Sequence, residues 1–350
     1  MPEEKQSRQG ASIQLPTSFD VAKRAGVSQS TVSLVLNGKA AGRVSQRTQE
    51  TVLQCARELG YQPSMAARAL RLGRTHVAAL IIPDVSNPVF AAVLQGAEQA
   101  ARQRDYTVVQ VSTGNDADWQ QRIMHALATR SIDGFMLCSV GLPESANLEL
   151  LRGNAVVVDA YSPEFPSLLL DIEYGATTAM RHLLELGHRR IAHLAAHIDV
   201  ETFRIRQRVY EHMLNEAGIA PRVDYQATAG VDVGEACSAA LGLLQGAQPP
   251  TAVFCDDDLM AAGVYKAARE LYLRVPDDLS IVGFCDGLVA QLLNPPLTTV
   301  VIPALEMGRR SMELLLASMG TERQPFAETL PLDFVIRAST ASPREKFAQN

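Results

Sequence analysis

The pattern of apolar and polar positions along the chain changes near residue 75. Up to that point, apolar residues recur at the three- to four-residue spacing of amphipathic helices. Residue types that favour helix ends divide this part into three short helices, which we expect at 19–25, 28–36 and 45–60. Residues 1–17 are polar and are predicted to be a disordered tail. The ordered part of the chain therefore begins with a small all-α unit, predicted to span 18–62.

One face of the third predicted helix carries the apolar residues Val52, Leu53, Ala56 and Leu59, which we expect in the core of this unit. Pro63 ends that helix, because the residue before a proline disfavours the helical conformation. Residues 63–74 then form a linker, whose helical stretch is too short to be stable alone in water. We expect this linker to become helical only when other contacts support it.

After residue 75, short apolar runs alternate with helical stretches. Such runs are typical of buried parallel strands. We expect them at 77–82, 107–111, 134–138, 155–158, 168–170, 191–195, 251–255, 279–284 and 299–302. The alternation predicts a doubly wound α/β architecture. One open sheet seldom has so many strands, so we expect two similar lobes with ligand-contacting residues at the carboxyl ends of their strands.

The charge of the chain changes at the same boundary as its hydrophobic pattern. The 350 residues have a formal net charge of −6, but residues 1–74 hold 11 Lys and Arg against 5 Asp and Glu. Residues 75–350 hold the other 21 basic residues against 33 acidic ones. A basic segment on an acidic body indicates that the segment meets a polyanion, and nucleic acid is the partner we expect. A solvated basic face is the alternative at this point.

Several classes of protein do not fit the sequence. No run of about 18 apolar residues is present, and residues 1–16 lack the apolar segment of a secretory signal. We therefore expect a soluble cytoplasmic protein with no membrane partner. The five cysteines are odd in number and form no Cys-x-x-Cys pair, which argues against disulfides and zinc. We expect buried apolar positions for Cys55, Cys138, Cys237, Cys255 and Cys285.

No enzyme or metal motif stands out. Phosphate-binding glycine loops, the Gly-x-Ser-x-Gly elbow and the His-Glu-x-x-His pair are absent. His188, His193 and His197 cluster, but no carboxylate has a suitable spacing to complete a metal site. The acidic run at 256–258 is more typical of a helix start, where carboxylates suit the dipole. We expect no catalytic residue, no metal and no cofactor. An enzyme or a ligand-binding module on a doubly wound fold is the alternative.

Residues 20–38 have the spacing of a helix-turn-helix. Ala22 is small where two helices approach closely, and Gly26 suits a left-handed turn. Apolar residues spaced to share one core are Val21, Val27, Val32 and Val35. In this motif the second helix enters the major groove, and its N-terminal residues reach the base edges.

The start of this second helix carries the candidate DNA-reading residues. Gln29 can bond adenine and Ser30 is less selective, so we assign both to base edges. Ser28, Thr31 and Ser33 are better placed for phosphates, which position a protein without reading sequence. A three-helix packing unit with no role in DNA binding is the alternative interpretation.

Several motifs, in one order along the chain, resemble the LacI/GalR (lactose repressor/galactose repressor) family of bacterial transcription regulators. The similarity runs from about residue 18 to residue 343. Its most specific segments are the helix-turn-helix at 20–38, Pro-Ser-Met-Ala-Ala-Arg-Ala-Leu at 63–70, Ile-Pro-Asp-Val-Ser-Asn-Pro at 82–88, Gly-His-Arg-Arg-Ile at 187–191, Val-Pro-Asp-Asp-Leu-Ser-Ile-Val-Gly-Phe at 275–284 and Pro-Leu-Thr-Thr-Val at 296–300.

The resemblance implies that the linker is a hinge helix, formed when two protomers bind a pseudo-palindromic operator. Leu70 would then wedge into the minor groove and kink the duplex. Ala67 would let two hinge helices pack closely, and Arg68 and Arg71 would meet the DNA backbone. A linker leucine buried against the body is the alternative for Leu70.

One departure from the family affects which operator is read. Leu34 stands one turn after the base-reading pair, where the family commonly has a polar or basic residue. An apolar side chain there contacts a thymine methyl or reads nothing. The following loop carries Lys39 and Arg43, which we expect to contact phosphates.

The body is similar to periplasmic sugar-binding proteins, and the resemblance implies an effector in the cleft between the lobes. The positions that match the family's cleft residues, with the neighbouring Asp286, are Phe90, Asp159, Arg206, Asp257, Cys285 and Asp286. An arginine in such a cleft can hold paired hydroxyls or a carboxylate through its planar fork. Arg204 and Arg208 lie nearby in sequence, so a solvated arginine face is the alternative for Arg206.

Two of these positions depart from the family's sugar-binding pattern. Asp257 stands where the family often has asparagine, and Cys285 stands where it has a ligand-bonding aspartate. A carboxylate that would bond hydroxyl groups is therefore lost or moved. We expect the effector to be a small polar molecule, with a sugar favoured over other classes.

The resemblance also implies the assembly and the limits of the domains. We expect a repressor that acts as a homodimer, because one helix-turn-helix reads only a half-site, and the end of the chain shows no leucine heptads of a tetramerisation tail. The predicted N-lobe comprises 75–171 and 303–330, the C-lobe comprises 172–302 and 331–343, and 344–350 is a tail.

Overall fold

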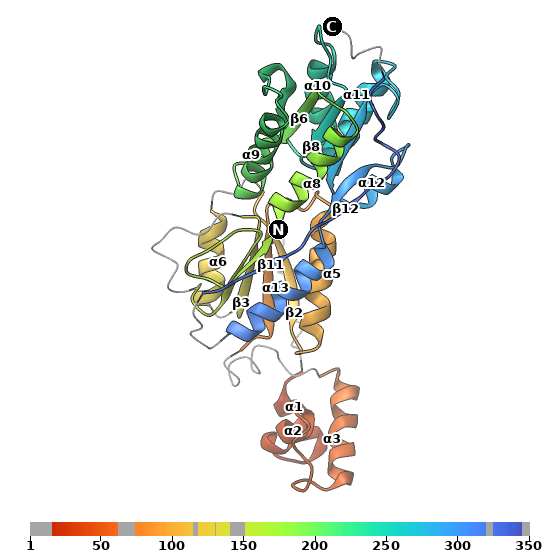
Figure 1. Cartoon of the computed structure of the whole chain (residues 1–350). Helices are drawn as coiled ribbons and strands as arrows, with labels where there is room; N and C mark the ends of the chain where they lie inside the picture. The colour runs from red at the N-terminus through yellow and green to blue at the C-terminus, as the bar shows by residue number, and fades with distance from the viewer. Residues whose placement is uncertain are drawn as a thin grey trace, which may run out of the picture. The chain divides into compact units, whose positions relative to one another are not determined.

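The computed structural model of the chain describes residues 16–61, 74–114, 118–129, 131–140, 151–319 and 325–344. The chain divides into two compact units, residues 1–75 and residues 76–350 (Figure 1). Most of the predicted tail and the hinge residues Ala67, Arg68, Leu70 and Arg71 lie outside the described residues.

The first unit contains three helices, α1 (Ser18–Ala25), α2 (Gln29–Leu36) and α3 (Gln46–Leu59), as the sequence predicts. Each helix begins at a hydroxyl residue whose side chain accepts a backbone N–H of the first turn; these residues are Thr17, Ser28 and Ser45. Gly26 follows α1 with a φ of 66°, the left-handed conformation expected at that turn.

The core of this unit is formed by residues from all three helices, among them Val21, Val32 and Val52. The expectation for Leu53 is wrong, because 43% of its surface is exposed, and Cys55 occupies the buried face of α3 instead. A helix advances about 100° per residue, so Leu53, next to the central Val52, lies at the edge of the apolar face.

The second unit contains two sheets of six strands each, counted over the described residues (Figure 1). The first sheet has the order β11-β5-β4-β3-β1-β2, and its paired strands are all parallel. Its strands are β1 (Val77–Ile82), β2 (Thr107–Ser112), β3 (Gly134–Cys138), β4 (Ala155–Val158), β5 (Ser167–Leu170) and β11 (Ala327–Leu330).

The second sheet has the order β12-β10-β9-β8-β6-β7 and is parallel except for the pair β10 and β12. Its strands are β6 (Ile191–Ala196), β7 (Gln226–Ala229), β8 (Ala252–Cys255), β9 (Ser280–Cys285), β10 (Thr298–Val301) and β12 (Asp333–Val335). The sequence did not predict β7, β11 and β12, because these edge strands are short and partly exposed and lack a continuous apolar run.

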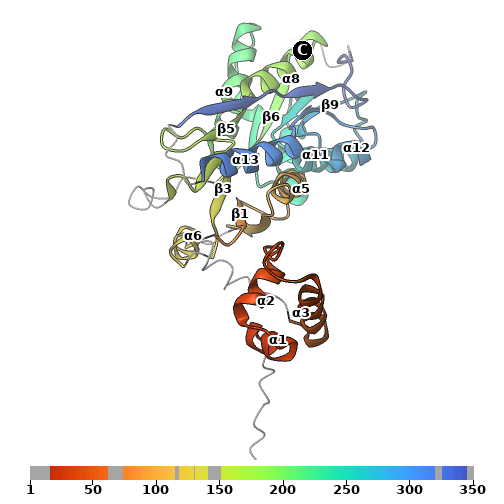
Figure 2. The same cartoon turned by 90° about the horizontal axis from the view of Figure 1, so that it is seen from below.

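Helices cover the sheets and make them the doubly wound lobes that the sequence predicts. The first lobe has α5 (Val89–Arg102), α6 (Trp119–Ala128) and α13 (Ala304–Ser318), and α5 and α13 pack side by side (Figure 2). The second lobe has α8 (Ile172–Glu185), α9 (Glu201–Glu216), α10 (Val233–Leu244), α11 (Asp258–Glu270) and α12 (Leu288–Leu292), with the short 3₁₀ helix η2 (Val223–Tyr225) before β7.

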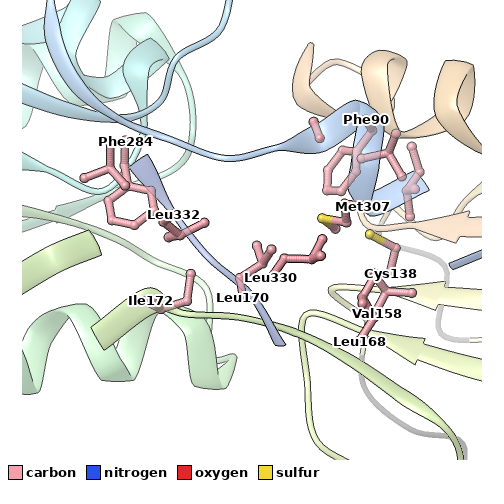
Figure 3. Close-up of a cluster of buried hydrophobic side chains, with 14 of the residues drawn as sticks. Phe90, Cys138, Val158, Leu168, Leu170, Ile172, Phe284, Met307, Leu330 and Leu332 are labelled. Atoms are coloured by element: carbon pink, nitrogen blue, oxygen red, sulfur yellow. The ribbon is translucent and has the colours of Figure 1, made fainter. Parts of the chain in front are cut away.

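Within the described residues the chain passes between the two lobes three times: after β5, after β10, and between β11 and β12. One apolar cluster continues across these crossings and includes residues of both sheets. Figure 3 shows Phe90 and Met307 on the side of the first lobe, Phe284 and Ile172 on that of the second, and Leu330 between them. The crossing segments therefore bring the carboxyl ends of both sheets to a common boundary.

Candidate functional site

The start of α2 is an exposed polar surface. Ser28, Gln29 and Ser30 are exposed, and Thr31 is partly exposed. The Ser28 hydroxyl accepts the Thr31 backbone N–H and contacts the hydroxyls of Ser30 and Thr31 at 2.7 and 2.9 Å. Gln29 has no hydrogen-bond partner among the described residues, so its amide is available to an external group. Ser33 and Leu34, farther along the helix, are half-buried.

Basic side chains surround this helix-turn-helix on several of its elements. Arg24 on α1 forms an ion pair with Glu58 on α3 at 2.7 Å, which joins these two helices. The loop after α2 exposes Lys39 and Arg43. The unit therefore presents positive charge beside an exposed recognition helix, as contact with DNA phosphates requires.

The second unit contains a cavity of about 160 Å³ at the boundary of the two lobes. Five of the six residues predicted for the effector site line it: Phe90, Asp159, Arg206, Asp257 and Cys285. Phe90 and Asp159 belong to the first lobe and the other three to the second. Residues up to 195 positions apart in sequence thus meet at one place, because each lies at the carboxyl end of a strand or on a helix that faces the boundary.

Arg206, on α9, is the cation of this cavity and is only 3% exposed. Its guanidinium donates from Nη1 to the backbone carbonyl of Asp256 and from Nη2 to the Thr202 hydroxyl at 3.4 Å. It lies 3.6 Å from the centre of the Phe284 ring, a distance suited to a cation–π contact. Arg204 is exposed and bonds acidic side chains at the surface, so the solvated-face alternative applies to that residue and not to Arg206.

Asp159, after β4, is a carboxyl group that the first lobe contributes to the cavity. It accepts a hydrogen bond from the Ser139 hydroxyl at 3.0 Å. Burial raises the pKa of Asp159 to about 6, and attraction to Arg206 and the Ser139 hydrogen bond limit the rise. This group can therefore change charge near neutral pH.

Asp257 and Cys285 form a second polar group on the other lobe. The Asp257 carboxylate caps α11 by accepting the Leu259 N–H at 2.8 Å. Its Oδ2 receives the Cys285 thiol at 3.5 Å and the Asn87 amide of the first lobe at 3.3 Å. Burial raises the pKa of Asp257 and that of the Cys285 thiol, which stays protonated. Cys285 is thus a hydrogen-bond donor to Asp257.

Asp286, the sixth predicted residue, does not line the cavity. It forms an ion pair at 2.6 Å with Arg337, and both side chains are mostly buried. The neighbouring carboxylate of Asp258 is also buried and accepts the Thr299 hydroxyl and the Gly287 N–H. Burial is the main cause that raises the pKa of Asp258, to about 7. These two aspartates hold the strand ends of the second lobe together.

The sequence did not single out several residues that line the cavity. Polar examples are Asn87, Ser139 and Thr202, and apolar ones include Val200 and Phe203. Asn87 lies inside the motif at 82–88, so its motif was visible in the sequence although its contact was not. The others fall on ordinary helix or loop positions, and only the fold brings them to the cavity.

The structure also places the histidines and cysteines that the sequence singled out. Among the described residues, no group of three or more histidine, cysteine or acidic side chains is arranged to hold a metal ion. His193 has a carboxylate partner that the sequence did not indicate, because its Nε2 lies 2.9 Å from the Asp256 carboxylate, 63 residues away. Cys55, Cys138, Cys237 and Cys255 are buried as expected, whereas Cys285 is partly exposed in the cavity.

No helix in the described parts of the chain is long and apolar enough to cross a membrane.

Two family models match the chain. Residues 19–64 match "Bacterial regulatory proteins, lacI family", and residues 180–340 match "Periplasmic binding protein-like domain". The first match covers the helix-turn-helix, and the second covers most of the lobe that contains Arg206 and Asp257.

Curated relatives are similar over nearly the whole chain. The HTH-type transcriptional repressor CytR of Escherichia coli (strain K12) is 33% identical over 329 residues, which cover 93% of this chain and 96% of the relative. A ribose operon repressor of Halalkalibacterium halodurans is 35% identical over 331 residues, which cover 93% of this chain and 97% of the relative.

A solved structure shares both units. The lac repressor dimer bound to operator and the anti-inducer ONPF is 26% identical, with a TM-score of 0.82, over 94% of this chain and 100% of that one. The helix-turn-helix, the two doubly wound lobes and the relatives that match over nearly the whole chain all indicate the same family. The chain belongs to the LacI family of bacterial regulatory proteins and is a DNA-binding transcriptional regulator.

Proposed function

We propose that this regulator is a cytoplasmic repressor whose helix α2 reads the operator as part of a homodimer. Gln29 and Ser30 lie at the exposed start of α2, which suits contact with base edges in the major groove. Ser28, Thr31 and Ser33 follow the same turn and are assigned to phosphates, together with Lys39 and Arg43. Leu34 contacts a thymine methyl or reads nothing.

The hinge completes the operator contact in this proposal. Leu70 enters the minor groove, Ala67 lies between paired hinge helices, and Arg68 and Arg71 bond the backbone. The support is the motif at 63–70 and the solved relative bound to operator as a dimer.

The cavity between the lobes is the proposed effector site. The observation that carries this assignment is the convergence of Phe90, Asp159, Arg206, Asp257 and Cys285 on one cavity. One guanidinium, the three carboxyl groups of Asp84, Asp159 and Asp257, and apolar walls suit a small molecule with several hydroxyl groups and an apolar face. A sugar is the favoured class, and the name of the ribose operon repressor agrees with that choice. Asp286 is assigned to supporting the site through Arg337.

Control of DNA binding follows from linkage between the two sites. We assign 75–171 with 303–330 to one lobe and 172–302 with 331–343 to the other. The segments that cross between the lobes are then the hinges about which the lobes move. A ligand that binds one arrangement of the lobes more tightly shifts the population of that arrangement. The size of the resulting change in operator affinity is limited by how differently the effector binds the two arrangements.

The operator part of the proposal is tested by sequencing genomic fragments that the purified protein retains. We expect a small set of fragments that share a pseudo-palindromic site, and the neighbouring genes would indicate the effector class. The control is a Gln29→Ala, Ser30→Ala variant, whose substitutions are at exposed positions and leave the fold intact. Equal recovery of the same fragments by this variant would contradict the assignment of α2.

The effector part is tested by calorimetry with ribose, cellobiose, cytidine and adenosine. We expect a compound that binds the wild type to lose affinity in Arg206→Gln. Arg204→Gln is the matched control, because Arg204 is on the same helix but exposed at the surface. Equal losses in both variants, or no binding of any sugar or nucleoside to the wild type, would rule out the assignment.

A further inference from the structure

A chain of buried polar side chains leads from the cavity into the second lobe. Asp256, which follows β8, is fully buried, and its carboxylate lies 2.9 Å from Nε2 of His193. His193, on β6, is also fully buried, between the rings of Tyr210 and Phe254. The backbone carbonyl of Asp256 accepts a hydrogen bond from Nη1 of Arg206. Asp256 thus joins a buried histidine to the guanidinium that lines the cavity.

The hydrogen bonds around His193 determine where its protons are. The Glu211 carboxylate can only accept, and it receives Nε2 of Gln207 at 2.5 Å. The amide of Gln207 therefore turns its oxygen toward Nδ1 of His193, at 2.7 Å, and Nδ1 donates. The same amide nitrogen also donates to Gln226 at 3.0 Å, in agreement with that orientation.

The other ring nitrogen of His193 donates as well. Burial by itself would raise the pKa of Asp256, but its contacts with His193 and Arg206 and the hydrogen bond from the Ala196 N–H hold it below its ordinary value. Asp256 is therefore ionised, and its carboxylate accepts from Nε2 of His193. Both ring nitrogens of His193 therefore face hydrogen-bond acceptors, and one of these acceptors is a buried carboxylate.

This pair bears directly on the geometry of the cavity. Arg206 has one strong anchor, the Asp256 carbonyl, since its contact with the Thr202 hydroxyl is longer at 3.4 Å. Its Nε is buried and has no hydrogen-bond partner among the described residues. The Asp256 carboxylate is held by His193 and the Ala196 N–H. The Asp256 carbonyl thereby keeps the guanidinium of Arg206 against Phe284.

We propose that His193 is a positioning residue for effector recognition: it fixes Asp256, whose carbonyl holds Arg206 in place at the wall of the cavity. This inference rests on the proposed effector site. The residue acts through Asp256 and Arg206 and does not itself line the cavity.

The first test needs no ligand. The ring nitrogens of histidine are followed by ¹⁵N NMR. We expect both nitrogens of His193 to carry protons, and its signals to be identified by their loss in His193→Gln. A signal of an unprotonated ring nitrogen from His193 would overturn the proposal.

His188 provides the matched control in the same lobe. It is also buried and bonds Thr251, Ser280 and the Ala341 carbonyl, and burial lowers its pKa to about 4. His188 should therefore show one protonated and one unprotonated nitrogen under the same conditions. Its contacts do not include Arg206, so His188→Gln tests the general effect of changing a buried histidine.

The second test measures Arg206 itself through the exchange of its Nε–H with solvent. We expect His193→Gln to raise this exchange rate about tenfold or more, the size associated with loss of a buried charge-assisted hydrogen bond, and His188→Gln to leave it within about twofold. An unchanged rate in a folded His193→Gln protein would refute the positioning role. Gln207→Met removes the outer partner of His193 at a half-buried position and should give a smaller rise.

The third test uses the compound among ribose, cellobiose, cytidine and adenosine that binds the wild type. His193→Gln should weaken it about tenfold, and the same substitution in an Arg206→Gln background should weaken it no further. Additive losses would refute the proposal. Binding of none of the four compounds would contradict the proposed function, whereas the NMR tests would still decide the role of His193.

Discussion

At the scale of single residues, the cavity differs from an ordinary polar surface in the state of its acidic groups. Burial raises the pKa of both Asp159 and Asp257, one from each lobe. The Cys285 thiol and the Asn87 amide both point at the Asp257 carboxylate, so this group already receives donors from both lobes. An effector hydroxyl that bonds Asp257 must share or replace them.

The raised pKa of Asp159 predicts a pH-dependent cost to stability. The folded chain binds this proton more tightly than the unfolded chain, so stability falls as the pH rises from about 3.8 to about 6, and the full cost is present above that range. Asp159→Asn removes the charge and suits the left-handed backbone at this position, φ 61°. We expect its Tm to exceed that of the wild type by about 2 to 6 °C at about pH 7.5, and the excess to shrink at about pH 4.5.

Asp84→Asn serves as the control, measured by the same thermal unfolding. Asp84 is exposed, and hydrogen bonds from the Ser86 N–H and hydroxyl lower its pKa. Its charged form is the stabilised one, so this variant should have a lower Tm than the wild type at about pH 7.5. An Asp159→Asn excess that is independent of pH would contradict the electrostatic explanation.

At the scale of elements, the first lobe depends on the close packing of α5 against α13. A Cβ added at Gly308 would lie 1.8 Å from the Val93 carbonyl oxygen, and one added at Gly96 would lie 1.8 Å from that of Leu305. Because both obstacles are backbone atoms, the helices would have to separate. The two glycines therefore allow an approach that no other residue permits.

Gly308→Ala should lower the free energy of unfolding by about 1–3 kcal/mol, because overpacking outweighs the better helix propensity of alanine. Gly242→Ala is the matched control, since Gly242 lies on α10 with no atom within 4 Å of an added Cβ. That variant should be stabilised by up to about 1 kcal/mol. Urea unfolding of both variants checks the prediction, and equal changes would disprove it.

Helix α2 and the loop after it are expected to contribute differently to DNA binding. Gln29→Ala should cost about 1–3 kcal/mol for the wild-type operator, with relaxed specificity and an unchanged salt dependence. Arg43→Ala should weaken all sequences alike and reduce the slope of log affinity against log salt by about two, for two copies in a dimer. Fluorescence anisotropy over a salt series separates these outcomes, and identical slopes in all three proteins would contradict the phosphate role of Arg43.

At the scale of the whole molecule, charge and function divide along the same boundary. The helix-turn-helix unit and linker carry the basic excess, and the two-lobed unit carries the acidic one. The acidity of the larger unit disfavours contact with DNA phosphates, so binding is directed to the helix-turn-helix. This division is an electrostatic property of the sequence and does not depend on how the units are placed.

Linkage predicts a reciprocal effect between effector and operator. If an effector changes operator affinity by some factor, operator DNA must change effector affinity by the same factor. Titration of the dimer with each ligand, in the presence and absence of the other, checks this equality. The dimer itself is checked by light scattering, and a factor of one in both titrations would show that the two sites are not coupled.

The parts of this protein that could be predicted from the sequence are those that depend on local interactions. Helix caps, apolar spacing and the glycine turn specify the helix-turn-helix, because each acts within a few residues. Buried parallel strands were predictable for the same reason, since both of their faces need apolar residues. Edge strands such as β12 were not, because partners elsewhere in the chain select them.

Contacts between residues that are distant along the chain depend on how the strands and helices pack in three dimensions. The pair of His193 and Asp256 spans 63 positions and the bond between Asn87 and Asp257 spans 170, and no local spacing indicates either. The same holds for Asp286, which turns to Arg337 while its neighbour Cys285 lines the cavity. Strand order and lobe crossings place these groups together, because the path of the backbone determines which strand ends become neighbours.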